Sequence, residues 1–543
     1  MLIKKTAAGL GVLALLVLPP LPAVGTTAQA QASPGSATPI PERFKRGTVV
    51  TGMPGESRAG SPAKKRTAGA HTIKIDVLDR SGKPPTTEQA SRAYIWPLNG
   101  DWPLGADIQD GHGEEPIPPG DYAIYTYVTT PEAGGKSSKT LVYLPKVSVT
   151  GDISLILDAR KARPIQVAVD RKDARLTDAL VLVSQKIGPR VQATALNLTG
   201  TDLYITPAPP GLGLAYHLQM TLTRNGTQTG SPYVYNLASA AEGIPADPSL
   251  RARGKDLAVV QTRHFGQGGP ACGGSHASID WGIGVTAGLY AETGALPTTR
   301  TEYFTTGLDW ELDEGVTTAD CAFENADISV RTERFSRPGI YARQWNDAPF
   351  GPGAGVLDLS AADDTSLDVA MLSTWHAYGS GDGMRGTSTL RDASGNVVGT
   401  SSIPGSGGPW PSPSPGKHTL TVDAERSVPW SDLATRQHIV WDLDVQDQKI
   451  INLPVVRHRA TLDMSNRAGP GSQQQISLIP EGLPANATPA FSISFDDGKT
   501  WQPVTVRPGG TASFRNPPSG HVSLRTIVPG VVHQTVIRAY AIS

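Results

Sequence analysis

The sequence predicts an all-β protein built from several consecutive β-sandwich domains. Turn-forming residues are frequent, with 59 Gly and 46 Pro among 543 residues, and they cut the chain into short segments that suit strands better than long helices. Many segments alternate apolar and polar residues, which is typical of strands with one buried face. Helical periodicity is short and rare, and residues 431–436 favour no more than one helical turn.

The first predicted strand begins at about residue 71. Ile73, Ile75 and Val77 alternate with polar residues, so they should face a core. A turn at 79–82 and the following pair of prolines end this strand. Further strands are predicted at 122–128, 141–144 and 153–157. This spacing predicts a small β-sandwich over residues 71–160.

The rest of the chain divides into three more predicted domains. Residues 161–300 should form a β-rich domain, residues 301–460 a β-sandwich, and residues 461–543 a C-terminal immunoglobulin-like β-sandwich. The last domain alternates clearly at Phe491 and Ile493. We expect the sandwiches to be of the immunoglobulin-like or carboxypeptidase-regulatory-like kind.

The N-terminus has the parts of a secretory signal peptide. Lys4 and Lys5 precede an apolar stretch at 7–18 that is too short to span a bilayer comfortably, and small residues suited to cleavage follow. Prolines after the stretch argue against the alternative of a membrane anchor. We therefore expect a signal peptide over residues 1–32, a secreted, extracellular protein, and no membrane attachment after cleavage.

Residues 33–70 are rich in Pro, Gly, Ser and Ala, which predicts a disordered linker. Its basic residues, such as Lys64 and Lys65, leave open a tether to an anionic cell wall or a processing site. The whole chain carries 48 basic and 49 acidic residues. This balance gives no indication of a nucleic-acid partner, which would need a clustered basic surface. The oligomeric state has no signature in the sequence.

The chain has two cysteines, Cys272 and Cys321. In an oxidising compartment an isolated pair most simply forms one disulfide. A metal or catalytic role is less favoured, because neither cysteine has the close spacing of metal ligands.

No catalytic residue is predicted. The run Gly399, Thr400 and Ser401 resembles the surroundings of a subtilisin-type nucleophile, but that serine needs a following helix. Here Pro and Gly residues follow, so we interpret the run as a hairpin arm. Asp309, Glu311 and Asp313 share one face of a predicted strand, which indicates a solvated edge more readily than a glycosidase pair.

Two kinds of ligand site stay open as hypotheses. Asp442, Asp444 and Asp447 lie on a predicted strand and its turn, where they could hold a structural calcium ion, although no EF-hand spacing is present. No other cofactor is expected. Aromatic residues of the first domain could stack on sugar rings, with core packing as the alternative. The aromatic candidates are Trp96, Trp102 and Tyr122.

The segment 494–501, SFDDGKTW, resembles the Asp-box. Its residues indicate a turn: Asp496 can accept amide hydrogen bonds, Gly498 supplies a positive φ, and Trp501 packs under the hairpin. In sialidases this motif repeats and lies away from the active site. A single copy predicts a hairpin and gives no support to sialidase activity.

Several blocks together resemble one family, the long C-terminal accessory region of large secreted subtilisin-like serine peptidases of Gram-positive bacteria. The blocks are 429–438 (PWSDLATRQH) with Trp441, 453–457 (LPVVR), 492–498 (SISFDDG) with Trp501, 521–525 (HVSLR) and 536–540 (VIRAY), and earlier 149–152 (VTGD) with Leu155 and Pro164. The resemblance implies accessory β-domains without a peptidase domain. It transfers no catalytic residue.

Two classes of function follow. The first is a secreted, non-catalytic protein whose β-sandwich domains bind an extracellular polymer such as the cell wall, a cell surface or a partner protein. The alternative is an extracellular hydrolase, either a peptidase relative or a glycosidase, with an active site that the sequence does not reveal.

Overall fold

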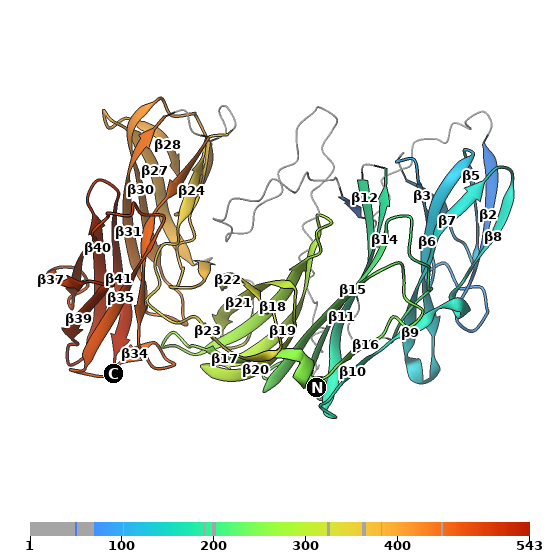
Figure 1. Cartoon of the computed structure of the whole chain (residues 1–543), viewed down its shortest axis with the longest axis horizontal. Helices are drawn as coiled ribbons and strands as arrows, with labels where there is room; N and C mark the ends of the chain where they lie inside the picture. Colours follow the sequence, from blue (N-terminus) through green and yellow to red (C-terminus); the bar gives the residue numbers. More distant parts are fainter. Residues whose placement is uncertain are drawn as a thin grey trace, which may run out of the picture. The chain divides into compact units, whose positions relative to one another are not determined.

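The computed structural model confirms the all-β fold class (Figure 1). It describes residues 49–51, 70–100, 103–188, 190–197, 202–322, 326–360, 365–381, 383–446 and 449–543. The predicted signal peptide lies outside these residues, as does the predicted linker apart from 49–51 and 70. No described helix is long and apolar enough to cross a bilayer. The helices are single 3₁₀ turns: η1 (Ala133–Gly135), η2 (Ala159–Lys161) and η3 (Gly254–Asp256).

The first domain packs a three-stranded sheet against a six-stranded sheet. The strand predicted at residue 71 lies at the centre of the smaller sheet, where Ile73 and Ile75 are fully buried. The smaller sheet has the order β5–β2–β8 and consists of β2 (His71–Leu78), β5 (His112–Ile117) and β8 (Ile153–Asp158). The larger sheet has the order β4–β3–β6–β7–β13–β9 and consists of β3 (Arg92–Pro97), β4 (Leu104–Asp107), β6 (Gly120–Pro131), β7 (Ser137–Val149), β9 (Arg163–Ile165) and β13 (Asp202–Ile205).

The six-stranded sheet is covered on both faces. Ile95 and Ile124 pack toward the three-stranded sheet. Their neighbours Trp96 and Tyr125 pack on the other side, against residues of a third sheet such as Val181. Successive side chains of one strand therefore enter two different cores, as expected for a sheet that lies between two layers.

That third sheet has eight strands in the order β1–β12–β11–β14–β15–β20–β17–β23. Its strands are β1 (Val49–Thr51), β11 (Ala174–Ile187), β12 (Arg190–Asn197), β14 (Leu214–Arg224), β15 (Tyr233–Glu242), β17 (Leu257–His264), β20 (Thr298–Thr305) and β23 (Gly339–Trp345). The boundary predicted at 300/301 falls inside β20. Strands β9 and β13, which the prediction assigned to the domain at 161–300, pair within the six-stranded sheet. Pairing between strands that are far apart in the sequence cannot be recognised from local periodicity.

A five-stranded sheet packs on the eight-stranded sheet, with Phe304 and Trp310 in their shared core. Its order is β19–β18–β21–β22–β26, with β18 (Ala271–Asp280), β19 (Thr286–Leu296), β21 (Asp309–Thr318), β22 (Asp327–Arg334) and β26 (Tyr378–Gly381). A separate two-stranded sheet pairs β10 (Val167–Val169) with β16 (Leu250–Ala252).

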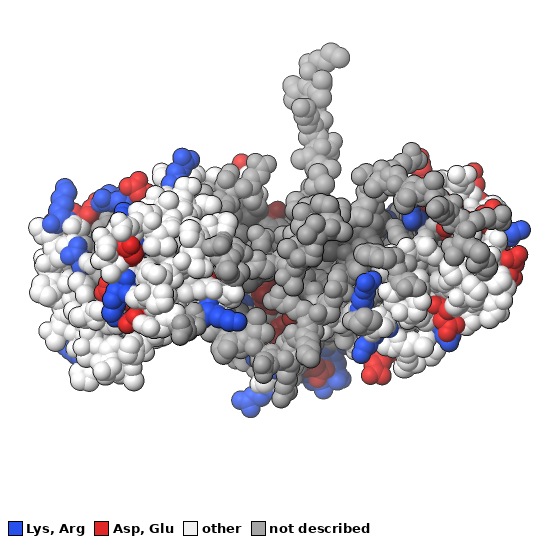
Figure 2. Space-filling model, turned by 90° about the horizontal axis from the view of Figure 1, so that it is seen from above, with Lys and Arg blue, Asp and Glu red and all other residues white. Residues whose placement is uncertain are grey.

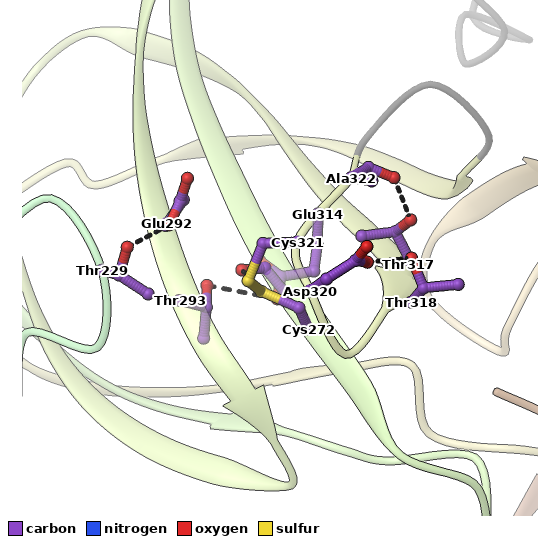
Figure 3. Close-up of a disulfide and its surroundings, with 11 residues drawn as sticks. Thr229, Cys272, Glu292, Thr293, Glu314, Thr317, Thr318, Asp320, Cys321 and Ala322 are labelled. Atoms are coloured by element: carbon purple, nitrogen blue, oxygen red, sulfur yellow. Dashed lines mark hydrogen bonds between the residues drawn. A yellow bond between two sulfur atoms is a disulfide. The ribbon is translucent and has the colours of Figure 1, made fainter. Parts of the chain in front are cut away.

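The predicted disulfide between Cys272 and Cys321 is confirmed (Figure 3). Cys272 lies on β18, and Cys321 lies in the loop that follows β21. The same loop is held by the Thr317 hydroxyl, which donates to the carbonyl oxygen of Ala322 at 2.5 Å. The disulfide therefore ties this loop to β18, an inner strand of the five-stranded sheet.

Residues from about 350 to the C-terminus share one core, in which Leu357, Trp441 and Ile476 come from three different sheets. The predicted boundary at 460/461 crosses the largest sheet, because β31 pairs with β41. This nine-stranded sheet contains β27 (Met384–Asp392), β28 (Val397–Ser401), β30 (Gly416–Arg426), β31 (Arg436–Val445), β34 (Arg467–Ala468), β36 (Ala490–Ser494), β37 (Gln502–Val504), β40 (Gly520–Val528) and β41 (Val532–Ile542). Two four-stranded sheets complete the region: β24 (Gly355–Asp358), β25 (Thr365–Asp368), β29 (Ser406–Trp410) and β32 (Ile450–Leu453) in one, and β33 (Val455–Ala460), β35 (Gln473–Glu481), β38 (Val506–Arg507) and β39 (Thr511–Arg515) in the other.

Candidate functional site

A row of charged residues crosses the outer face of the nine-stranded sheet. Arg385 on β27 lies opposite Glu425 on β30, and Glu425 lies opposite Arg436 on β31. All three side chains are exposed. Directly opposed residues on antiparallel strands have Cβ atoms about 5 Å apart, so the register places two guanidinium groups on either side of one carboxylate.

This row opens onto a cavity of about 580 Å³, a volume within the range of small-molecule sites. Its charged lining consists of Arg385, Glu425, Arg426, Arg436, Asp497 and Arg538. No aromatic ring lines it. Four arginines against two acids make the cavity a concentration of positive charge in a chain that is close to neutral overall.

The predicted Asp-box turn forms one wall of this cavity. Asp496 Oδ1 accepts a hydrogen bond from the amide of Thr500 at 2.9 Å, and the Thr500 hydroxyl donates to Asp496 Oδ2 at 2.6 Å. These bonds from Thr500, joined by one from Ser494, lower the pKa of Asp496 to about 2. Gly498 has a φ of +83°, and a Cβ there would lie 2.7 Å from Cδ1 of Ile537. The turn therefore requires glycine at this position, as the sequence predicted.

The residue after Asp496 points into the cavity. Asp497 Oδ2 accepts a hydrogen bond from Arg538 Nη2 at 2.8 Å, and its Oδ1 accepts one from Nε at 3.1 Å. This two-point contact with Arg538 lowers the pKa of Asp497. Arg436 also reaches the turn, donating to the backbone oxygen of Asp497 at 3.4 Å. The Asp-box turn thus positions a charged group, Asp497, to which the sequence pattern gave no role.

Backbone strain gathers around the same cavity. Asp497 and Arg538 have φ values of 56° and 58°, and Ala434, beside the cavity-lining Thr435, has a φ of 48°. Arg538 lies at a β-bulge opposite Ser523, whose hydroxyl accepts its amide hydrogen at 3.1 Å. Left-handed backbone at residues other than glycine is uncommon and clusters at ligand sites, and bulges commonly redirect a side chain toward such a site.

Arg426 closes the inner end of the cavity and is itself buried. Its guanidinium donates to the carboxylate of Asp327 on β22, to Gln267 Oε1 at 2.7 Å and to the backbone oxygen of Leu433 at 2.8 Å. Trp430 Nε1 also donates to Asp327, at 2.7 Å. Arg426 is therefore held from behind, and its charge is balanced by Asp327.

The predicted aromatic sites need correction. Trp96 and Tyr122 are buried, at 6% and 3% exposure, because the six-stranded sheet is covered on both faces. Neither ring can stack on a sugar in this arrangement. Trp102 lies outside the described residues. Core packing, the alternative, accounts for both described residues.

Of the predicted calcium ligands, the structure describes Asp442 and Asp444, and neither belongs to a group of three possible metal ligands among the described residues. Asp442 and Asp444 lie exposed on β31, and Asp444 Oδ2 accepts from Lys417 Nζ at 2.8 Å. Asp447 lies outside the described residues. Among the described residues, no group of three His, Cys, Asp or Glu side chains could hold a metal ion. Alternation along one strand spreads carboxylates over a sheet instead of turning them toward one point.

The structure places Ser401 at the end of β28, on a hairpin arm paired with β27, as predicted. A different serine contacts a histidine: Ser278 Oγ lies 3.0 Å from His276 Nδ1, and Asp313 Oδ2 lies 3.3 Å from the same nitrogen. A serine–histidine–aspartate relay needs the serine and the acid on different ring nitrogens. These three residues also lie outside the lining of the arginine cavity.

Asp309, Glu311 and Asp313 occupy the more open face of β21, but the predicted solvated edge is wrong, because β21 is the central strand of the five-stranded sheet. Asp309 pairs with Arg334 at 2.8 Å, while Trp310 and Leu312 are buried on the other face. Glu311 is half-buried, and burial together with the nearby Asp313 raises its pKa. Asp309 is thus engaged in a surface ion pair.

Comparisons with known proteins assign no family. No protein-family model matches the chain, and no curated protein matches it. Solved structures with local likeness include a candidate adhesin from Bacteroides ovatus, at 12% identity over 35% of this chain and 94% of that chain with a TM-score of 0.14. The Bacillus anthracis TIE protein is 13% identical over 51% of each chain with a TM-score of 0.12, and Escherichia coli alpha-2-macroglobulin is 8% identical over 83% of this chain and 38% of that chain with a TM-score of 0.13. Scores this low carry no argument about function.

Proposed function

We propose that this chain is an exported, non-catalytic binding protein whose C-terminal region carries its ligand site. The observation that carries the proposal is the arginine-lined cavity, where Arg385, Arg436 and Arg538 meet around strained backbone. Exposed guanidinium groups in a cavity attract ligands and partners with oxygen anions.

Export is supported by two independent features. The N-terminal segment has the composition of a signal peptide, and the Cys272–Cys321 disulfide is of a kind that persists in oxidising compartments. The resemblance of the C-terminal blocks to accessory regions of secreted peptidases fits the same proposal. The ligand would then be an extracellular polymer such as the cell wall, another cell surface or a partner protein.

A sedimentation assay tests this function. The purified mature chain is mixed with insoluble peptidoglycan, chitin or cellulose, and the retained fraction is compared with that of the variant Arg385→Gln/Arg436→Gln. Retention of the unmodified chain on peptidoglycan, which carries carboxylates, with loss in the double variant, is expected; chitin and cellulose are the neutral comparisons. The control is Arg391→Gln, because Arg391 is exposed on the same strand but outside the cavity.

The hydrolase alternative has its own test. Casein and ester substrates are incubated with the chain with and without a serine-directed inhibitor. Turnover that the inhibitor blocks would replace the binding proposal with a hydrolytic one.

A further inference from the structure

We propose that the arginine cavity binds a single compact oxyanion, a carboxylate or a phosphate, carried by the ligand. This inference rests on the proposed function and specifies the chemistry of the same site. Three features of the cavity lead to it: two guanidinium groups that form no ion pair with the described residues, a rigid frame behind them, and charge balance on the surrounding face.

The two available guanidinium groups belong to Arg385 and Arg436. Neither forms an ion pair with any described residue, and Arg436 makes only the long 3.4 Å contact with the Asp497 backbone. The planar guanidinium fork matches the oxygens of carboxylates and phosphates in two-point contacts. The register sets the two groups on either side of Glu425, so both can approach a ligand from opposite sides.

The remaining arginines form the frame. Arg538 is committed to Asp497 through two hydrogen bonds, and Arg426 is committed to Asp327 and Gln267. These groups are held in place before a ligand arrives, which lowers the entropic cost of binding. Glu425, between the two available arginines, repels any anion and lowers the net positive charge there, so the site favours one anionic group over several.

The surrounding face excludes a long polyanion as the preferred ligand. Asp423 Oδ1 lies 2.7 Å from His438 Nδ1 on the neighbouring strand, and at the far end of the same two strands Lys417 is paired with Asp444. Figure 2 shows Lys and Arg side chains interspersed with Asp and Glu side chains on the described surface that it presents. Polyanion binding needs a continuous basic stripe, whereas acidic residues lie opposite basic ones along β30 and β31.

Ring stacking does not compete as the source of affinity. The cavity has no aromatic lining. Trp501, which ends the Asp-box segment, has Arg525 3.9 Å from its ring centre. Recognition of the ligand at this site therefore depends on charge and hydrogen bonding.

Arginine-specific modification with phenylglyoxal, followed residue by residue by mass spectrometry, tests the inference on the full mature chain. The probes are glucuronate, glucose 6-phosphate and glucose, which share a ring and differ in the anionic group; poly-glutamate serves as the polyanion. Glucuronate or glucose 6-phosphate should slow modification of Arg385 and Arg436 and leave Arg391 unaffected. Which of the two protects better identifies carboxylate or phosphate as the preferred group.

Affinity measurements on variants complete the test. Arg385→Gln removes a charge-assisted contact worth about 1.5 to 3 kcal/mol, so affinity for the protecting anion should fall about tenfold to a hundredfold. Arg391→Gln should change it less than about twofold. Equal protection by glucose, equal protection of Arg391, protection by poly-glutamate alone or no protection would each overturn the inference.

The experiments distinguish failure of the binding function from failure of the compact-anion inference. Polymer retention that depends on Arg385 but is unaffected by either small anion overturns the compact-anion inference and leaves the binding function standing. Protection of Arg385 and Arg436 without retention on any polymer or surface supports the anion site and removes the polymer-binding function.

Discussion

Arg538 and Asp497 face each other through two hydrogen bonds of 2.8 and 3.1 Å, and both residues hold left-handed backbone. One comes from a bulged strand and the other from a hairpin turn. Their contact therefore joins two local irregularities into one wall of the arginine cavity.

Asp497→Asn should weaken binding at this wall of the cavity while leaving the stability of the fold nearly unchanged. Both side chains are about one-third exposed, and exposed ion pairs contribute less than about 1 kcal/mol, so the free energy of unfolding should change little. The freed Arg538 should lose its fixed orientation, and polymer retention should fall. Urea unfolding and the sedimentation assay check the two effects. A large loss of stability, or unchanged retention, would contradict the positioning role of Asp497.

Loss of the disulfide should lower thermal stability. Cys272 and Cys321 are 49 residues apart, and closing a loop of this length stabilises the folded state by about 4 kcal/mol in the chain-entropy model. Cys272→Ser/Cys321→Ser should lower the melting temperature by several degrees. Reducing agent should lower the melting temperature of the unmodified chain and leave the double variant unaffected. Identical melting curves for the unmodified chain and the double variant would contradict a stabilising role of the disulfide.

The core between the eight- and five-stranded sheets contains buried charge. Glu302 accepts from Arg300 Nη2 at 2.7 Å and from Arg343 Nη1 at 2.6 Å. Burial opposes its ionisation, but Arg300, His264 and Arg343 outweigh burial and lower the pKa of Glu302. Glu302→Gln would leave the buried Arg300 without a carboxylate partner and Arg343 with Glu333 alone, which should cost roughly 3 to 5 kcal/mol.

The matched control for Glu302→Gln is Asp309→Asn. Asp309 pairs with Arg334 at 2.8 Å, but both side chains are more than half exposed, so its loss should cost less than about 1 kcal/mol. Denaturant unfolding of the two variants compares the costs. Equal effects would mean that the buried cluster does not depend on the charge of Glu302.

Acid should destabilise the C-terminal region through His458. This imidazole is buried, its Nε2 lies 2.8 Å from the Thr526 hydroxyl, and burial lowers its pKa from 6.5 to about 4. Between these values the unfolded chain binds a proton that the folded chain does not. The free energy of unfolding should therefore be highest above about pH 6.5 and fall toward pH 4, by roughly 3 kcal/mol from this group.

Urea unfolding across that pH range checks the titration of His458. His458→Asn should flatten the pH dependence. His217, whose pKa burial also lowers to about 4, contributes a similar slope in the unmodified chain and in the variant. A pH profile that His458→Asn does not flatten would contradict the prediction.

Local patterns in the sequence predicted local structure well. Alternation identified Ile73 and Ile75 as core residues, and the segment containing Asp496 and Gly498 identified the Asp-box turn. Both depend on chemistry within a few residues. The same reasoning failed at Trp96, because β3 lies in a sheet covered on both faces and its alternation does not report exposure.

The arginine cavity could not be predicted in the same way. Arg385, Arg436 and Arg538 are far apart in the chain and meet only through the pairing of β27, β30, β31 and β41. No spacing rule connects them. A hint was present in the resemblance blocks, which contain Arg436 and Arg538, but the residues were interpreted as parts of strands and turns.

The most direct test of the binding account is a crystal structure of the chain grown with whichever anion, glucuronate or glucose 6-phosphate, protects Arg385 from modification. The account predicts the carboxylate or phosphate group within hydrogen-bonding distance of the guanidinium groups of Arg385 and Arg436. A ligand bound elsewhere, with both arginines uncontacted, would contradict it.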